Sequence, residues 1–421
     1  MPGRRKGISV NNTKSIMILG AGEGQVPLIR RARESGWKTI VVSPQGDYPG
    51  FDLADVCAFS DISDKATILQ YAQQFKISAI ATDQTDVSVP TVLFIAEQME
   101  LPCIQCESID SFRLKSLMRK ICAEKGITSI PYCVSSSIID VIAFFDTLTN
   151  DSAIIKPIDS QGSRGVQKIS SREGIYAAFE EAKKYSRSGS VIIERFVEGV
   201  EIEVDTVVRN KQIICTLIGD VYNFDVENSF SAYERIYPTS LPTPLQDSIH
   251  AVNAKVIRCF GLDTGWTHGE YVVDKYNNVY LLEIGARGGG NFIGSDIVRE
   301  MVGVSTDEMA FCTAIGDASF YDRVFLRDCF CAYRCFYLPE GEVVSLDITD
   351  GFLNEPFILT HNLNQIYVGL KTHKNTDKTS RFTIVVKEKS REALEEKLIA
   401  IEESIRITVK TEDGEQGIIW R

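Results

Sequence analysis

Residues 268–291 read HGEYVVDKYNNVYLLEIGARGGGN. Two short apolar runs flank the polar sequence DKYNN, which is typical of two antiparallel strands joined by a turn. If the strands pair symmetrically about the bond between Tyr276 and Asn277, Glu270 lies opposite Glu283. Directly opposed side chains share one face of a hairpin, so this stretch predicts two carboxylates that face each other.

The same register pairs Val272 with Leu281 and holds the two glutamate side chains about 5 Å apart. Like charges at that distance destabilise a sheet, and a hard divalent cation bound together with phosphate groups is the usual way to neutralise them. We therefore expect Glu270 and Glu283 to bind Mg2+, with Mn2+ as an alternative ion. A solvated pair on the surface is the competing interpretation.

Three neighbouring features favour the metal site over the surface pair. His268 lies two residues before Glu270 and so shares its face of the strand. Arg287 follows Glu283 and can bind phosphate or carboxylate oxygens with two hydrogen bonds. The glycines at 288–290 let the backbone approach a ligand closely.

A second phosphate-binding feature precedes the hairpin in the chain. Lys156 ends an apolar run and is followed by the glycine loop SQGSRG at residues 160–165. A lysine ammonium is a point charge, and the N–H groups of such a loop form a nest for anions. The loop is not a Walker A motif, because no Gly-Lys-Ser/Thr follows it. An ordinary exposed loop is the alternative.

The N-terminal part of the chain alternates short apolar runs with helical stretches. The predicted strands are residues 15–19, 39–42, 79–82 and 103–104, and the predicted helices are residues 26–35, 66–75 and 89–99. This alternation predicts a parallel sheet with right-handed crossovers. We expect Asp83 and Asp86, which follow the third strand, to point toward the ligand-binding edge of that sheet.

The glycine turn at 20–24 does not predict a nicotinamide site. The dinucleotide fingerprint requires a small residue at the position of Gln25, and no acidic residue ends the second strand. We interpret the turn as one that lets the backbone approach some other anionic ligand.

The rest of the chain predicts strands and helices in mixed order. Lys115 lies in a helix that Gly126 ends. The further predicted helices are residues 138–148, 173–185 and 390–404, and the further predicted strands are residues 153–156, 166–169, 190–194, 201–209, 212–221, 331–338 and 382–387. We expect Glu203 to be an exposed strand residue, and Arg235 to form a surface salt bridge rather than to pair with a substrate carboxylate.

Composition excludes several classes of function. The 421 residues include 45 Lys plus Arg against 57 Asp plus Glu, a net charge of -12, which disfavours nucleic-acid binding. Neither an apolar run long enough to cross a bilayer nor a secretion signal is evident, so we expect a cytoplasmic protein with a flexible tail at 1–13. The 11 cysteines are scattered, which favours reduced, mostly buried thiols over disulfides or zinc.

The segment at residues 191–203, VIIERFVEGVEIE, completes a combination that resembles the ATP-grasp superfamily. That family has a lysine in a helix, a lysine before a glycine loop, an E-x-F-V-x-G-x-E segment and two metal carboxylates around a hairpin, in this order. Glu283-Ile-Gly-Ala-Arg287, with His268-Gly-Glu270 before it, is most similar to the amino-acid ligase and carboxylate–amine ligase branch.

The resemblance implies a role for each candidate residue. It implies that Lys115, Lys156 and His268 contact the nucleotide, with the two lysines on the phosphates, and that the loop of Gln161, Gly162, Ser163 and Gly165 closes over it. Glu194, Phe196 and Val197 would hold the adenine, Glu201 the ribose, and Glu270 and Glu283 the metal, while Lys156 and Arg287 would be catalytic. The family's second metal strand carries E-x-N, whereas Gly285 stands here in place of the asparagine; Asn291 is a candidate replacement.

The implied architecture is an ATP-grasp fold of mixed α/β and α+β class. We expect an N-terminal Rossmann-like parallel-sheet domain at 14–109, a two-lobed ATP-binding domain at 110–318 with a lid at about 130–190, and a small α+β domain at 319–421. The implied function is an ATP-dependent carboxylate–amine ligase that forms an acyl phosphate and releases ADP and phosphate. A bicarbonate-dependent carboxylase and a catalytically inactive ATP-binding regulator are the alternatives. The expected partners are a small carboxylate and an amine, without nucleic acid or membrane, in a possible homodimer.

Overall fold

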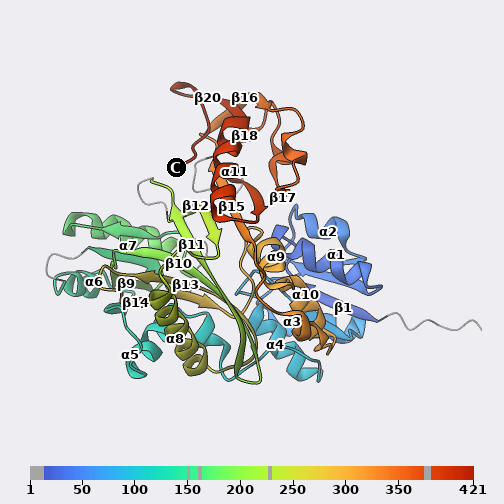
Figure 1. Ribbon diagram of the computed structural model, residues 1–421. Coiled ribbons are helices and arrows are strands. Elements are labelled where there is room, and N and C mark those ends of the chain that lie inside the picture. Colours follow the sequence, from blue (N-terminus) through green and yellow to red (C-terminus); the bar gives the residue numbers. More distant parts are fainter. Residues whose placement is uncertain (1–13, 149–151, 160–163, 226–229, 374–380) are drawn as a thin grey trace, which may run out of the picture. The chain divides into compact units, whose positions relative to one another are not determined.

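The computed structural model describes residues 14–148, 152–159, 164–225, 230–373 and 381–421 (Figure 1). Two compact units divide the chain. The first runs to Ile104 and also includes Thr306–Asp322, and the second comprises Gln105–Ser305 and Arg323–Arg421. The predicted tail at 1–13 lies outside the described residues, and the three-domain boundaries stay a prediction.

The first unit contains a four-stranded sheet in the order β3-β2-β1-β4, and every pairing in it is parallel. Its strands are β1 (Ser15–Leu19), β2 (Lys38–Ser43), β3 (Val56–Phe59) and β4 (Ala79–Ala81). Its helices are α1 (Val26–Glu34), α2 (Pro49–Leu53), α3 (Lys65–Phe75), α4 (Val89–Gln98) and α10 (Thr306–Ala314). The predicted parallel sheet is confirmed, but the sequence reading omitted β3, of which only Ala58 is buried.

Gln25, the residue that breaks the dinucleotide fingerprint, stabilises the glycine turn. Its side chain accepts a hydrogen bond from the Gly22 N–H and donates one to the Asp83 carbonyl oxygen. Gly20 has a φ of +98°, and a Cβ there would lie 2.7 Å from the Gln25 Oε1 atom. The turn therefore packs on its own glutamine, and the Asp83 side chain is buried, where Thr306 donates a hydrogen bond to it.

The second unit is built on a large sheet of nine strands, in the order β14-β13-β10-β11-β12-β15-β19-β17, with β5 paired to β13. The strands are β5 (Gln105–Cys106), β10 (Val200–Arg209), β11 (Gln212–Asn223), β12 (Ala232–Tyr237), β13 (Leu262–Val273), β14 (Val279–Gly285), β15 (Phe330–Tyr337), β17 (Ile358–His361) and β19 (Arg381–Glu388). The prediction of a strand at 103–104 was wrong: the strand is β5, two residues further on and in the other unit.

The same unit contains the helices α5 (Lys115–Glu124), α8 (Thr243–Phe260) and α9 (Val298–Val302). The sequence reading omitted α8 although its signals are ordinary ones. Ile249, Asn253, Val256 and Phe260 recur at helical spacing and are buried, and Gly261 ends the helix in the left-handed conformation. Helix α8 lies against the sheet (Figure 1).

A smaller lobe of the second unit carries four antiparallel strands in the order β6-β9-β7-β8. These are β6 (Tyr132–Ser135), β7 (Ala153–Pro157), β8 (Gln167–Ile169) and β9 (Val191–Arg195), with helices α6 (Ile138–Phe145) and α7 (Ile175–Lys184). Apolar side chains from both helices and the sheet form one core. The strand β7 ends at Lys156 and Pro157, which places the lysine beside the glycine loop.

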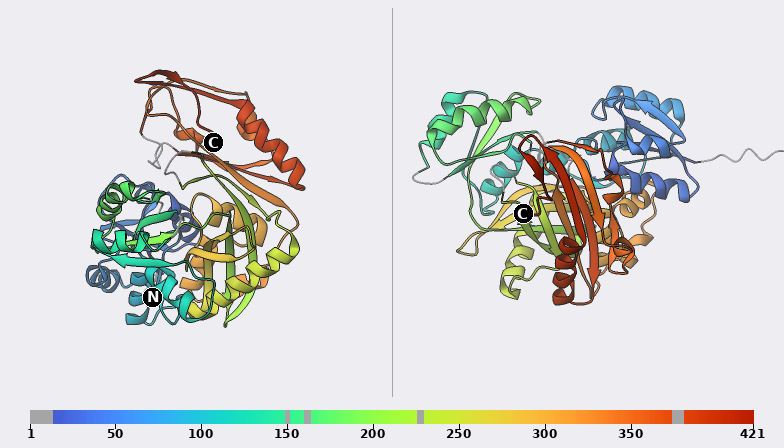
Figure 2. Two further views of the ribbon diagram at one scale, coloured as in Figure 1. Left: turned by 90° about the vertical axis from the view of Figure 1, so that its left-hand side faces the viewer. Right: turned by 90° about the horizontal axis from the view of Figure 1, so that it is seen from above.

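The C-terminal part of the second unit adds a sheet in the order β18-β16-β20-β21 and one long helix. The elements are β16 (Gly341–Ile348), β18 (Lys371–Thr372), β20 (Ile405–Thr411), β21 (Gly414–Gln416) and α11 (Arg391–Ser404). Figure 2 shows α11 lying along these strands, and its buried face packs against β15, β19 and β20. No helix among the described residues combines the length and the apolar character needed to span a bilayer.

The central hairpin has the predicted pair but not the predicted turn. Glu270 is the partner of Glu283, as expected, whereas Val272 pairs with Tyr280 and not with Leu281. The register shifts between Glu270 and Tyr271, because Leu282 is an extra residue on β14. The turn is thus displaced by one residue from the predicted one, and the bulge restores the predicted register at the two glutamates.

Candidate functional site

A cavity in the second unit, between the small lobe and the large sheet, collects most of the predicted site. Its charged lining residues are Lys115, Lys156, Arg164, Arg195, Glu194, Glu201, Glu270 and Glu283, and its other lining residues are Ile130, Ile154, Pro157, Val166, Phe196, Val197, Phe230 and Leu282. His268, Arg287 and Gly165 are not among them. The predicted loop residues Gln161, Gly162 and Ser163 lie outside the described residues.

The two candidate metal ligands lie side by side on β13 and β14. The Glu270 side chain is 48% exposed and the Glu283 side chain 27%, and both line the cavity. Desolvation raises the pKa of Glu270, the charge of Arg235 acts against this, and the charge of Glu283 raises the pKa further. Desolvation also acts on Glu283, but Lys115, whose Nζ lies 3.0 Å from its Oε2, outweighs it and lowers that pKa. The pair thus keeps negative charge that a cation can neutralise.

Glu194 is the centre of a buried ion cluster in the same cavity. Its side chain is 1% exposed and accepts hydrogen bonds from Arg119 at 2.6 Å and from Lys156 at 2.8 Å. Burial acts to raise the pKa of Glu194, but the two cations outweigh it and lower the pKa to about 2. The Glu194 carboxylate is therefore ionised and paired with Arg119 and Lys156, and it fixes the position of the Lys156 ammonium.

Arg119 is a site residue that the sequence reading missed. It is 1% exposed, contacts Glu194, and donates a second hydrogen bond to the Leu282 carbonyl oxygen, next to Glu283. Helix α5 places Arg119 one turn after Lys115, so both side chains leave the same face of the helix. The four-residue spacing was the signal available in the sequence.

The expectation that Glu203 is exposed was wrong. Glu203 is fully buried: its carboxylate lies 2.6 Å from the Arg235 Nε atom and 3.2 Å from the His268 Nε2 atom, and Tyr237 donates a hydrogen bond to it. Burial acts to raise its pKa, but Arg235 and His268 lower it to about 2. Glu203 and Glu270 are register partners on β10 and β13, which alternation alone does not distinguish from an exposed row.

The expected surface salt bridge of Arg235 was wrong for the same reason. The Arg235 side chain is 15% exposed, and besides Glu203 it contacts the Tyr333 hydroxyl and lies 3.9 Å from Glu270. Its strand β12 is separated from β10 by β11, where Gly219 leaves room: a Cβ at Gly219 would lie 2.4 Å from the Tyr237 ring. The missing side chain lets residues of β12 reach across β11 to Glu203.

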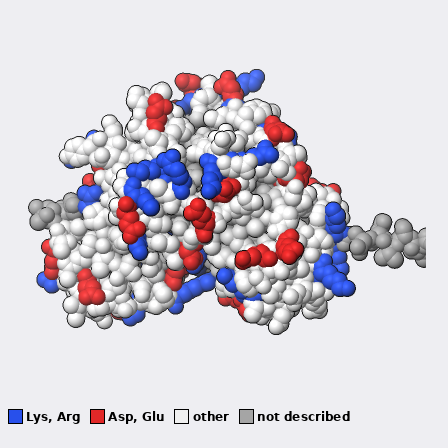
Figure 3. All heavy atoms as spheres, turned by 90° about the horizontal axis from the view of Figure 1, so that it is seen from below, with Lys and Arg blue, Asp and Glu red and all other residues white. Residues whose placement is uncertain are grey.

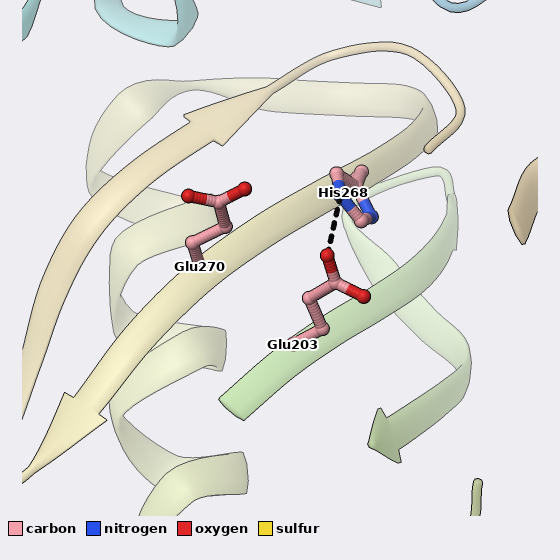
Figure 4. A group of neighbouring side chains, drawn as sticks. All are labelled: Glu203, His268 and Glu270. Atoms are coloured by element: carbon pink, nitrogen blue, oxygen red, sulfur yellow. Dashed lines mark ion pairs between the residues drawn. The ribbon is translucent and has the colours of Figure 1, made fainter. Parts of the chain in front are cut away.

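Glu203, His268 and Glu270 form a compact group that resembles a metal site in outline (Figure 4). Both imidazole nitrogens of His268 are engaged, Nε2 with Glu203 at 3.2 Å and Nδ1 with Asp205 at 2.9 Å. Burial acts to lower the pKa of His268, but the two carboxylates raise it to about 10. An imidazolium is not a metal ligand, so His268 belongs with Glu203 and Asp205 to an internal charge cluster, and Glu270 is the member of the group that lines the cavity.

The segment after β9 supplies apolar and polar lining. Phe196 and Val197 follow Glu194 in the cavity wall, and the Lys168 ammonium lies 4.1 Å from the centre of the Phe196 ring. Glu201 accepts a hydrogen bond from the Asn223 side chain at 2.9 Å. One end of the cavity therefore has an aromatic wall and a carboxylate, and the other end has the lysines and the facing glutamates.

The loop after β14 places Arg287 beside the facing glutamates. Its charge lowers the pKa of Glu283, and its Nη1 donates a hydrogen bond to the Gly288 carbonyl oxygen at 3.0 Å. The Asn291 side chain contacts the Cys335 sulfur at 3.2 Å and the Thr383 hydroxyl at 3.0 Å. Asn291 thus anchors this loop to the sheet, and nothing in its contacts supports the role of substitute metal ligand.

Comparison with known proteins agrees with this geometry. Residues 149–296 match the model of the ATP-grasp domain. The chain therefore contains an ATP-grasp domain. The matched range contains Lys156, Glu194, Glu201, Glu270 and Glu283, so the resemblance seen in the sequence is confirmed at the level of this domain.

Curated relatives match part of the chain. A D-alanine–D-alanine ligase of Trichlorobacter lovleyi is 27% identical over 134 residues, which cover 31% of this chain and 42% of that protein. The matched stretches span 36% to 57% of the lengths of the first curated relatives. These relatives show that the domain is shared, and the activity of the whole chain does not follow from them.

Solved structures match the fold over nearly the whole chain. An L-amino acid ligase from Bacillus licheniformis has a TM-score of 0.78 at 18% identity and covers 95% of this chain and 99% of its own. The biotin carboxylase domain of a Hydrogenobacter thermophilus 2-oxoglutarate carboxylase, a dimer in complex with MgADP, has a TM-score of 0.70 at 14% identity and covers 97% and 92%. These matches confirm the predicted ATP-grasp fold around the parallel N-terminal sheet.

Charges outside the cavity are of mixed sign. On the face shown in Figure 3, the Lys and Arg side chains of the described residues are intermingled with Asp and Glu side chains. The net charge of the chain is -12. The candidate site is the cavity, whose lining brings the facing glutamates and the lysines together.

Proposed function

We propose that the protein is an ATP-dependent carboxylate–amine ligase of the amino-acid ligase type, which forms an acyl phosphate and releases ADP and phosphate. The observation that carries the proposal is the pairing of Glu270 with Glu283 in a cavity that also contains Lys115 and Lys156. Two hard carboxylates and two ammonium groups in one cavity fit Mg2+ and a triphosphate together.

The residues present fit each part of the nucleotide. The facing carboxylates line the cavity with oxygen donors, which are the ligands that Mg2+ prefers, and Lys115 pairs with only one of them. We assign the adenine to the backbone and aromatic wall at Phe196 and Val197, because the Glu194 carboxylate is already paired with Arg119 and Lys156. Glu201, at the same end of the cavity, is placed to accept the ribose hydroxyls.

The chain's own groups act by position and charge. When bound, Mg2+ would neutralise phosphate charge and orient the phosphates for attack by the substrate carboxylate. Lys156, held by Glu194, and Lys115, held by Glu283, offer fixed ammonium groups for the transferred phosphate. Arg287 is positioned beside Glu283 to stabilise the acyl phosphate until an amine displaces phosphate. No nucleophilic side chain is needed.

A carboxylase that activates bicarbonate is the second candidate, because the same fold occurs in the biotin carboxylase domain described above. The experiment that separates the two is a phosphate-release screen with Mg-ATP and pairs of carboxylates and amines. Release that needs both an acid and an amine, with formation of a hydroxamate when hydroxylamine replaces the amine, supports the ligase. Release that needs bicarbonate alone supports the carboxylase, and nucleotide binding without release supports an inactive regulator.

Two coarser features of the proposal are testable separately. We propose a cytoplasmic location, which fluorescence of a tagged full-length protein would check. We also propose a homodimer, in line with the dimeric biotin carboxylase domain. Sedimentation equilibrium at micromolar concentration that gives a single monomeric species would contradict the dimer.

A further inference from the structure

One face of the C-terminal strands is polar, in contrast to the face that packs on α11. Register pairs Arg235 of β12 with Tyr333 of β15, and Tyr337 of β15 with Arg381 of β19. Because side chains alternate along a strand, Tyr333, Tyr337 and Arg381 lie on the same face as Arg235. The opposite face carries Phe336 and Phe382, which belong to the core with α11.

The Arg381 side chain has no ion pair or hydrogen bond with any of the residues that the structure describes, whereas the side chains of the other arginines of these strands are paired. Arg235 pairs with Glu203, and Arg334, on the opposite face, pairs with Glu234 and Glu402. Arg381 is half-buried. Burial acts to lower its pKa, but the Cys335 thiol and the Tyr333 and Tyr337 hydroxyls outweigh it and raise the pKa.

Hydroxyl groups surround this guanidinium instead of acids. Thr383, two residues after Arg381 on the same face, contacts Cys335 at 3.0 Å and Asn291 at 3.0 Å. Tyr333 and Tyr337 are almost fully buried on the neighbouring strand. An arginine among neutral hydroxyls, without a counter-charge, is suited to a planar anion that accepts two hydrogen bonds from it.

Arg235 connects this position with the proposed reaction centre. Its guanidinium lies 3.9 Å from Glu270 and is close enough to Arg381 to affect the pKa of that residue. Asn291, which is anchored to Thr383, ends the loop that carries Arg287. Arg381 is thus linked to the facing glutamates through Arg235, and to the loop that carries Arg287 through Thr383 and Asn291.

We propose that Arg381 binds a carboxylate of the substrate other than the one that is phosphorylated. The inference rests on the proposed ligase function and narrows its substrates to pairs in which one member carries an additional carboxylate. That group has two sources, the amine substrate if it is an amino acid, or the acid substrate if it is a dicarboxylate. Arg381 fixes the orientation of that substrate, while Arg287 and the lysines act at the phosphate.

The test combines direct binding with turnover. Saturation-transfer NMR in the presence of MgADP uses the standard L-amino acids and succinate, glutarate and adipate as probes, for the wild type, Arg381→Lys and Arg381→Met. The matched control is Arg406→Met, an exposed arginine on β20 of the same C-terminal part. We expect a carboxylate probe to bind to the wild type and to the control, to weaken about 10-fold to 100-fold in Arg381→Met, and to weaken less in Arg381→Lys.

Turnover then distinguishes the two sources of the carboxylate. An amino acid is compared with its amide as the amine substrate, and a dicarboxylate with its monomethyl ester as the acid substrate. The preference of the wild type for the charged member identifies the source, and Arg381→Met should lose that preference while the KM for ATP stays within about twofold.

The outcomes separate the failure of this inference from the failure of the ligase proposal. Equal binding of every probe by wild type and Arg381→Met, or binding by neither, overturns the carboxylate site even if ligation is observed. If Arg381→Met loses binding of the neutral analogue to the same degree as binding of the charged one, the carboxylate site is also overturned, because the effect of the substitution is then structural. A wild type that binds the probes through Arg381 but never releases phosphate contradicts the ligase and leaves the binding site supported.

Discussion

Glu203 and the facing pair of Glu270 and Glu283 lie on neighbouring strands of the large sheet. We treat Glu203 as the first group and the facing pair as the second, and the two groups differ in what neutralises their charge. Glu203 is fully buried, with Arg235, His268 and Tyr237 around its carboxylate, and its pKa is lowered to about 2. Glu270, its register partner, opens into the cavity opposite Glu283, and its pKa is raised. The first group is neutralised by the protein, and the second is left for a ligand.

This difference is a physical criterion for function within one sheet. A buried carboxylate that already has cations costs several kcal/mol to disturb and therefore belongs to the fold. Two facing carboxylates, of which Glu270 has a raised pKa partly because of the charge of Glu283, are unfavourable until a cation binds, and the fold tolerates them only where a cation is available. The predictions below test this assignment, beginning with the largest effect.

Glu270→Gln should lower turnover by about a thousandfold, because it removes one of two proposed magnesium ligands. The thermal midpoint should not fall, since the substitution also removes repulsion from Glu283 and Glu203. Steady-state kinetics and calorimetry on the same preparation check both parts. Retention of wild-type turnover would show that the facing carboxylates do not hold the metal.

Glu203→Gln, in contrast, should destabilise the protein. We expect a loss of about 3 kcal/mol in the free energy of unfolding, because Arg235 and His268 lose their buried counter-charge. Urea denaturation measures the loss. If Glu203→Gln and Glu270→Gln destabilise the protein equally, the contrast between the two groups is wrong.

Lys156→Ala should weaken ATP binding about 10-fold to 100-fold, because a charged hydrogen bond to phosphate is lost while Arg119 still pairs with Glu194. Isothermal titration calorimetry with a non-hydrolysable ATP analogue provides the measurement. Lys120→Ala is the matched control, since Lys120 is an exposed lysine of α5. An unchanged affinity in Lys156→Ala would remove this lysine from the phosphate site.

Glu198→Gln should change the free energy of unfolding by less than about 0.5 kcal/mol. Its side chain is 80% exposed, and its contact with Lys168 is a surface pair at 3.5 Å. The same urea titration as for Glu203→Gln applies. A loss comparable to that of Glu203→Gln would show that burial does not distinguish the glutamates of this region.

The sequence was sufficient for features that depend on neighbours along the chain. The strand–turn–strand pattern predicted the contact of Glu270 with Glu283, and the position of Lys156 at a strand end before a glycine loop predicted its place in the cavity. The predicted turn was nevertheless displaced by one residue, because a bulge at Leu282 cannot be recognised from alternation.

The sequence was insufficient for residues whose environment is made by distant strands. Arg119 is 75 positions from Glu194, and Arg334 is 100 positions from Glu234. The wrong expectations for Glu203 and Arg235 have one cause, because alternation identifies a face of a strand without telling whether water or another strand covers it.

The sequence by itself therefore determined the periodic elements, the facing glutamates and the lysine beside its glycine loop, since each follows from backbone geometry over a few residues. Only the tertiary structure decided which of the many acidic side chains are neutralised. That choice depends on the separation of charges in space: Gly219 on β11 leaves room for the Tyr237 ring, and the Arg235 guanidinium lies 2.6 Å from Glu203 but 3.9 Å from Glu270.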